Sequence, residues 1–84
     1  MFFTYILYSR SIDRYYIGHT HDLASRLERH NAGWSKSTKA GIPWKILYHE
    51  EYDTKGEAMK RENEIKRQKS RIYIENLIMK KQQM

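Results

Sequence analysis

The sequence predicts an α+β fold in which helices flank a three-stranded antiparallel sheet, in the order β-β-α-β-α-α. Two apolar, β-favouring runs, residues 2–8 and 15–20, are separated by a short polar segment, which is the pattern of a β-hairpin. A third such run lies between two segments that begin with helix-capping residues. The chain has 84 residues, so these elements are expected to form one domain over 1–84.

The first helix is expected over about residues 22–32. Asp22 offers a side-chain oxygen for the N-cap, and Leu23 and Leu27 follow at helical spacing. Gly33 suits the position just after the last turn, because glycine adopts a positive φ without strain. Before this helix, Gly18 in the hairpin is expected to let a ligand or a helix approach the backbone closely.

The second half is expected to contain a loop over 34–43, a third strand over 44–52 and two helices. The segment 54–57 reads Thr-Lys-Gly-Glu and matches a capping box, so a helix over about 55–69 should follow. An apolar segment over 72–79 is expected to form the last helix, and the final residues, Gln82–Met84, are expected to fray. The helices should cover the sheet and close a single core.

Composition limits the classes of function. The chain has no cysteine, which excludes disulfide scaffolds, thiolate metal sites and cysteine nucleophiles. No apolar run approaches the roughly 20 residues of a membrane helix, and the first residues lack the pattern of a signal peptide, so the cytoplasm is the expected compartment. The net charge of +6 favours an anionic partner, chiefly nucleic acid.

Two charged residues lie on helix faces that should be apolar. Arg26 falls in the stripe of Leu27 and His30, and Glu62 falls in the stripe of Ala58 in the later helix. A half-buried charge needs a partner, because an unpaired one is costly. Arg26 and Glu62 could form a buried salt bridge between the helices, or they could serve a hydrolytic site as a cation and a metal ligand.

The strand tyrosines allow two similar interpretations. Tyr5 and Tyr16 could simply pack against neighbours with their hydroxyls hydrogen-bonded. Alternatively, one phenol could position or deprotonate a water, which requires a nearby metal ion or arginine to lower its pKa. His19 and His21 are a weak match to a metal pair, because neither cysteine nor a suitably spaced carboxylate accompanies them.

Five short motifs together resemble the GIY-YIG nuclease domain family, over about residues 3–70. They are Tyr5-Ile6-Leu7, Tyr16-Ile17-Gly18, Asp22-Leu23-x-x-Arg26-Leu27-x-x-His30-Asn31-x-Gly33, Pro43-Trp44-x-Ile46-x-Tyr48 and Glu57-Ala58-x-x-Arg61-Glu62-x-x-Ile65-Lys66. Within the family, the chain resembles the small single-domain UPF0213 group and is similar to the N-terminal nuclease domain of the excinuclease subunit UvrC. The first motif departs from the pattern, since only its tyrosine is shared.

The resemblance implies metal-dependent cleavage of phosphodiester bonds. Tyr5 falls on the tyrosine of the first motif, and Tyr16 falls on that of the second, a general base. Arg26 falls on the catalytic arginine, and His30 falls where members carry His or Tyr. Glu62 falls on the metal-binding glutamate. One carboxylate completed by phosphate oxygens and waters suits Mg²⁺, or Mn²⁺ in its place.

Basic side chains are expected to hold the DNA backbone without reading its sequence. The candidates are Lys36, Lys39, Lys45, Lys60, Arg61, Lys66, Arg67, Lys69 and Arg71. Each could equally be part of a solvated helix face. The expected substrate is branched or damaged DNA, or DNA without preference, and a protein partner could supply the target. The alternatives are a noncatalytic nucleic-acid-binding or adaptor module, and a protein-interaction domain in which Arg26 and Glu62 are structural.

Overall fold

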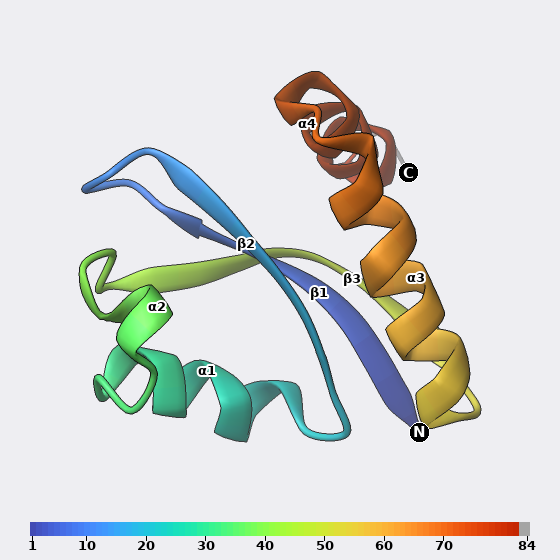
Figure 1. Cartoon of the computed structure of the whole chain (residues 1–84), viewed down its shortest axis with the longest axis horizontal. Helices are drawn as coiled ribbons and strands as arrows, with labels where there is room; N and C mark the ends of the chain where they lie inside the picture. Colours follow the sequence, from blue (N-terminus) through green and yellow to red (C-terminus); the bar gives the residue numbers. More distant parts are fainter. Residues whose placement is uncertain (83–84) are drawn as a thin grey trace.

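Three strands form one antiparallel sheet in the computed structural model, which describes residues 1–82 (Figure 1). The strands are β1 (Phe2–Ser9), β2 (Arg14–Thr20) and β3 (Trp44–Tyr52), in the sheet order β2-β1-β3. β1 is therefore central, and β2 and β3 are the two edges. In the β1–β2 register, Tyr5 lies opposite Gly18, which matters for the site below. The predicted fold class is confirmed.

Four helices surround this sheet. They are α1 (Leu23–Asn31), α2 (Lys36–Lys39), α3 (Lys55–Gln68) and α4 (Arg71–Gln82). The predicted caps are formed, because the Asp22 carboxylate accepts from the Ser25 N–H and the Thr54 hydroxyl accepts from the Glu57 N–H. Helix α4 is longer than predicted. Gln82, which was predicted to fray, is the last residue of this helix. The other two residues of the segment predicted to fray, 83–84, lie outside the described residues.

Helix α2 lies where the sequence predicted a loop. Its single turn is held by a side chain from the following strand, since the Trp44 indole Nε1 donates to the Thr38 carbonyl at 2.6 Å. The Trp44 ring also lies so close to Gly41 that a Cβ there would be 2.3 Å from it. The Asn31 side chain bonds both backbone groups of Trp44, which ties the end of α1 to the start of β3. Local propensity could not predict this turn.

The expectation of a single core is wrong, because both faces of the sheet are covered. Helices α1 and α2 lie apart from α3 and α4 (Figure 1), and each pair packs on its own apolar cluster. Tyr5 and Leu7 of β1 pack with Trp44 on the α1 face, whereas Ile6 between them packs with Ile65 on the α3 face. Successive side chains of a strand point to opposite faces, so a continuous apolar strand requires cover on both.

Within residues 1–82, no helix has the length and apolar character needed to cross a bilayer.

Candidate active site

A chain of buried hydrogen bonds runs from β1 through α1 to α2. The Tyr5 hydroxyl lies 3.1 Å from His30 Nε2, and His30 Nδ1 lies 2.9 Å from the Thr38 hydroxyl. Thr38 in turn donates to the Ser35 carbonyl. Because the single Thr38 proton is used there, Thr38 must accept from Nδ1–H, and the bare Nε2 must accept from Tyr5. The geometry therefore specifies a neutral imidazole with its proton on Nδ1.

Burial and charge both support these protonation states. Tyr5 is 2% exposed and His30 is 4% exposed. Burial, and then the charge of Arg26, lowers the pKa of the His30 imidazole. Burial, and then the neighbouring Tyr16, raises the pKa of Tyr5 to about 12, although Arg26 opposes this. At neutral pH both groups are uncharged, so Tyr5 is a donor and not a base.

Gly18 makes room for the buried phenol. A Cβ on Gly18 would lie 2.6 Å from the Tyr5 hydroxyl oxygen, which no real side chain tolerates. The close approach predicted at Gly18 is thus present, but the Tyr5 ring of the neighbouring strand makes it, in place of the expected ligand or helix. Gly18 lies in the edge strand β2, so the tip of Tyr5 reaches the open edge of the sheet.

Tyr16 is the more accessible of the two phenols. Its ring packs edge-on against His30, with centroids 4.9 Å apart, and it also touches Trp44 at 6.3 Å. Among residues 1–82, its hydroxyl has no hydrogen-bond partner, yet every buried side-chain polar atom in that range has one. The Tyr16 hydroxyl therefore faces solvent while its ring is held by the His30 cluster.

Arg26 projects from α1 beside the two buried groups. It is half-buried, and its positive charge lowers the pKa of both Tyr5 and His30. The salt bridge with Glu62, one of the two interpretations open from the sequence, is not formed within residues 1–82. Its absence follows from the fold, because α1 and α3 cover opposite faces of the sheet.

Glu62 is instead paired with residues of its own face. Its Oε1 lies 2.5 Å from His19 Nδ1, and its Oε2 lies 2.5 Å from Lys66 Nζ, one helical turn further along α3. Burial raises the pKa of the Glu62 carboxyl, but the hydrogen bonds from Lys66 and His19 outweigh it and hold the pKa below its ordinary value. Glu62 is thus an ionised, half-buried carboxylate at neutral pH.

The residues around Glu62 fit only a metal site that the substrate completes. Within residues 1–82, no group of three or more acidic, histidine or cysteine side chains could surround an ion. One carboxylate with a nearby imidazole fits an octahedral ion that keeps most of its waters and takes phosphate oxygens. The Lys66 ammonium would have to leave Glu62 Oε2 first.

The structure brings together most of the site residues that the sequence suggested. Tyr5, Tyr16 and His30 touch one another, Arg26 lies beside them, and the Glu62 charge is close enough to raise the pKa of Tyr5. These groups meet at the edge strand β2, the phenols and arginine from one face and the carboxylate from the other.

Sequence reasoning missed three interactions. Thr38 is the partner of His30, His19 is a hydrogen-bond partner of Glu62, and Lys66 is the counter-ion of Glu62. The i,i+4 spacing from Glu62 to Lys66 was a usable signal for the last pair. Strand alternation could have identified His19, since it shares a face of β2 with Ile17, which packs toward α3. No sequence pattern indicated Thr38.

The candidate DNA-binding residues divide into two groups. Arg61 is committed to Glu50, with Nε 2.9 Å from Oε1, and both side chains are only 19% exposed. Arg61 therefore does not contribute a free charge to the surface. Exposed cations remain on α2, β3, α3 and α4 and just after α3, namely Lys36, Lys39, Lys45, Lys60, Lys66, Arg67, Lys69 and Arg71. Of these, Lys66 and Arg71 are also in ion pairs.

Comparison with known proteins identifies the family of this chain. The model of the GIY-YIG catalytic domain matches residues 1–77. The chain belongs to the GIY-YIG family. This membership makes a nuclease-type enzyme the general functional class, and it confirms the family resemblance that the sequence suggested.

The relatives place the chain within the UPF0213 group. A UPF0213 protein of Bacillus pumilus is 42% identical over 71 residues, covering 80% of this chain and 72% of that relative. One of Staphylococcus aureus is 48% identical over 52 residues, covering 61% of this chain and 63% of that relative. The solution NMR structure of a UPF0213 protein from Bacillus halodurans has a TM-score of 0.58 and 31% identity, covering 94% of this chain and 84% of that one.

Proposed function

We propose that this protein is a metal-dependent endonuclease that hydrolyses phosphodiester bonds in DNA. The observation that carries the proposal is the meeting, at the edge strand β2, of a solvent-facing phenol, a half-buried arginine and an ionised carboxylate. The net charge of +6 favours capture of a polyanion. A branched or damaged strand is the proposed form of the substrate, since no helix within residues 1–82 presents a set of side chains suited to reading bases in a groove.

Tyr16 is the proposed general base, because its hydroxyl reaches solvent where a nucleophilic water would stand. Tyr5 is a positioning residue, because its hydroxyl donates to His30 and the His30 ring packs edge-on against the Tyr16 ring. Because His30 is neutral, its role is to hold the two phenols in place and not to bind the phosphate by charge. Thr38 fixes the tautomer by accepting from Nδ1–H.

Arg26 and Glu62 have opposite electrostatic roles. The Arg26 guanidinium can donate two hydrogen bonds to the oxygens on which charge develops during cleavage. Glu62, with His19 beside it, would hold Mg²⁺ or Mn²⁺, which when bound neutralises the phosphate and stabilises the leaving oxyanion. Lys66 keeps the carboxylate ionised in the absence of the ion.

The test compares Glu62→Gln with Glu64→Gln, a charge-matched change on the same helix. Each variant is incubated with single-stranded, duplex and branched DNA in Mg²⁺ or Mn²⁺. Removing the carboxylate should reduce the rate at least about 100-fold, whereas Glu64→Gln should stay near the wild-type rate. Cleavage that persists both in EDTA and in Glu62→Gln would overturn the assignment of Glu62.

A noncatalytic DNA-binding module is the second candidate. It is favoured by the fact that both oxygens of Glu62 are already occupied, by His19 and Lys66. Salt-dependent binding of DNA, with no cleavage of any substrate in either metal, would select this candidate over the first.

A further inference from the structure

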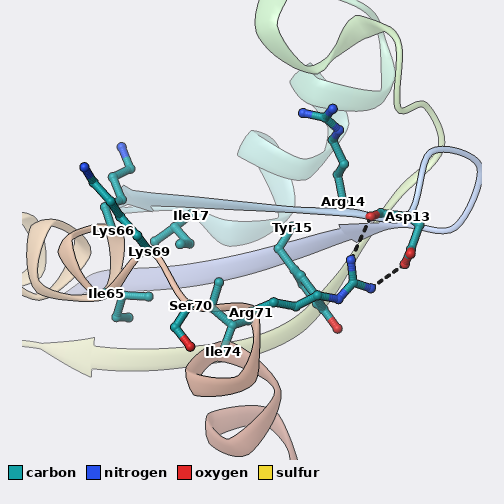
Figure 2. A pocket seen from close by; sticks show the side chains of 10 residues that line it. All are labelled: Asp13, Arg14, Tyr15, Ile17, Ile65, Lys66, Lys69, Ser70, Arg71 and Ile74. Atoms are coloured by element: carbon teal, nitrogen blue, oxygen red, sulfur yellow. Dashed lines mark hydrogen bonds and ion pairs between the residues drawn. The ribbon is translucent and has the colours of Figure 1, made fainter.

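A hollow lies on the α3 face, away from Tyr5 and Tyr16. This cleft, which we call the β2–α4 cleft, has a volume of about 470 Å³. It is lined by residues from the start of β2, the end of α3 and the start of α4 (Figure 2). Its lining residues are Asp13, Arg14, Tyr15, Ile17, Ile65, Lys66, Lys69, Ser70, Arg71 and Ile74.

The cleft lies next to the candidate active site, because Lys66 lines the cleft and pairs with Glu62. Along β2, Ile17 shares a face with His19, which holds Glu62. Along α3, Lys66 follows Glu62 by one helical turn, and Lys69, the left-handed residue that ends the helix, lines the cleft together with Lys66. The six residues from Glu62 to the last residue of α3, Gln68, span about 9 Å, or roughly three nucleotide steps at 3.4 Å each. A strand cut beside Glu62 would therefore pass over the cleft.

The charges of the cleft leave two cations free. Arg71 is paired with Asp13 and Glu75, and Lys66 is paired with Glu62. Arg14 and Lys69 form no ion pair within residues 1–82. Figure 2 shows Lys66 and Lys69 on one side of the cleft and Arg14 on the other, with the Arg14 side chain directed away from the isoleucines. The cleft thus has a free cation at each end, and phosphates on both sides of an occupant could reach one.

The floor between these cations is apolar. Ile17, Ile65 and Ile74 form it, and they belong to the cluster that packs α3 and α4 on the sheet. A nucleotide combines an apolar base face with an anionic phosphate, and an unpaired strand exposes both. In a duplex the base faces are stacked inside the helix, so only phosphates and sugars would reach the rim.

We propose that the β2–α4 cleft holds an unpaired nucleotide of the DNA substrate, next to the bond that is cut. The base rests on the three isoleucines, and its flanking phosphates contact Arg14 and Lys69. This inference rests on the proposed function and adds that the substrate carries a single-stranded segment beside the cleavage point.

The experiment measures binding in EDTA, so its result does not depend on cleavage. The double variant Arg14→Gln/Lys69→Gly removes the two free cations; glycine is chosen because Lys69 has a φ of 47°. The control is Arg10→Gln/Lys80→Gln, which removes two exposed cations that lie outside the cleft. Fluorescence anisotropy compares a single-stranded oligonucleotide with a blunt duplex of equal length.

The cleft variant should bind the single strand about tenfold more weakly than wild type, and the salt dependence of its affinity should be shallower by about 1.4 for two lost phosphate contacts. The control variant should lose less than about threefold on either DNA. Equal losses on single strand and duplex, or an equal loss in the control, would overturn the proposal.

A second measurement reads the floor directly. Adding single-stranded hexadeoxyadenylate should shift the methyl resonances of Ile17, Ile65 and Ile74, because an adenine ring resting on them changes their local field. Ile46, which packs on the opposite face, should not shift. Shifts confined to rim residues, with the isoleucine methyls unchanged, would show that the base does not enter and would overturn the proposal. Neither outcome bears on whether Glu62 supports cleavage.

Discussion

The two faces of the sheet bury their polar groups in opposite ways. On the α1 face, Tyr5, His30 and Thr38 form a neutral relay, and the pKa directions of Tyr5 and His30 keep both uncharged. On the α3 face, Glu50 and Glu62 are ionised and paired with cations. A neutral group needs only a hydrogen-bond partner when buried, whereas a charge needs a counter-charge as well.

The comparison indicates why the candidate site lies at the edge strand. A nuclease needs a base together with charged groups for the phosphate. The α1 face supplies the phenols and Arg26, and the α3 face supplies the Glu62 carboxylate. At β2 the Tyr5 hydroxyl lies against Gly18, which has no side chain, and there the negative charge of Glu62 raises the pKa of Tyr5. We expect changes at Gly18 to affect both faces, and changes elsewhere to affect one.

The largest effect on stability is expected from Gly18→Ala. The new methyl would overlap the Tyr5 hydroxyl, whose ring is buried and bonded to His30, so unfolding should become easier by about 2–3 kcal/mol. Gly56→Ala is the matched control. It lies in α3 with nothing within 4 Å of a Cβ, and alanine there should stabilise by up to about 1 kcal/mol. Urea denaturation of both variants measures the difference; equal stabilities would contradict the packing argument.

The next effect is expected from the ion pair of the α3 face. Glu50 accepts from Arg61, Tyr48 and Tyr52, so Glu50→Gln should lower the free energy of unfolding by about 2 kcal/mol. A double-mutant cycle with Arg61→Met isolates the coupling between the two side chains. Additive losses from the two single changes would show that the pair contributes no coupling.

The two faces should also lose stability in different ranges of pH. The pKa of buried His30 is lowered from 6.5 in the fold, so its contribution is complete above about 6.5 and is lost as the pH falls toward the folded value. For Glu50, burial raises the pKa, but the bonds from Arg61 and the two tyrosines lower it below 4.5, so that contribution is lost only below about 4.5.

Thermal denaturation from pH 7 to 3 tests this separation. His30→Gln should flatten the upper part of the profile, and Glu50→Gln should flatten the lower part. His49 shifts in the same direction as His30, because of burial and the charge of Lys81, so His49→Gln is the reference for the upper range. If His30→Gln left the pH dependence of stability unchanged between about pH 7 and 5, the loss of stability in that range would come from another titrating group.

The smallest effect is expected from Lys69→Gly. Lys69 ends α3 in the left-handed region, with φ of 47°, where glycine is unstrained. The variant should be more stable by about 0.5 kcal/mol, even though it loses a proposed DNA contact. Chemical denaturation, read beside the binding assay, separates the two effects; a clear loss of stability would show that the lysine side chain supports the fold.

The sequence predicted the elements better than their surroundings. Strands, caps and the long helices follow from alternation, capping boxes and turn residues, which act between neighbours in the chain. Helix α2 and the second core do not follow from such local signals. The hydrogen bond from Trp44 to Thr38 holds α2 in place, and the second core exists because helices cover both faces of β1. The partners of Glu62 needed the register of β2 against α3.

By itself, the sequence determined which side chains are available for chemistry: two strand phenols, an arginine and a glutamate on helix stripes, and a surplus of cations. The identities and spacing of these residues are fixed by the covalent chain and do not depend on folding. Only the tertiary structure decided that Arg26 and Glu62 do not pair, that Arg61 belongs to Glu50 and that the phenols differ in exposure. Those outcomes depend on which face of the sheet each helix covers, and that choice is set by packing over the whole chain.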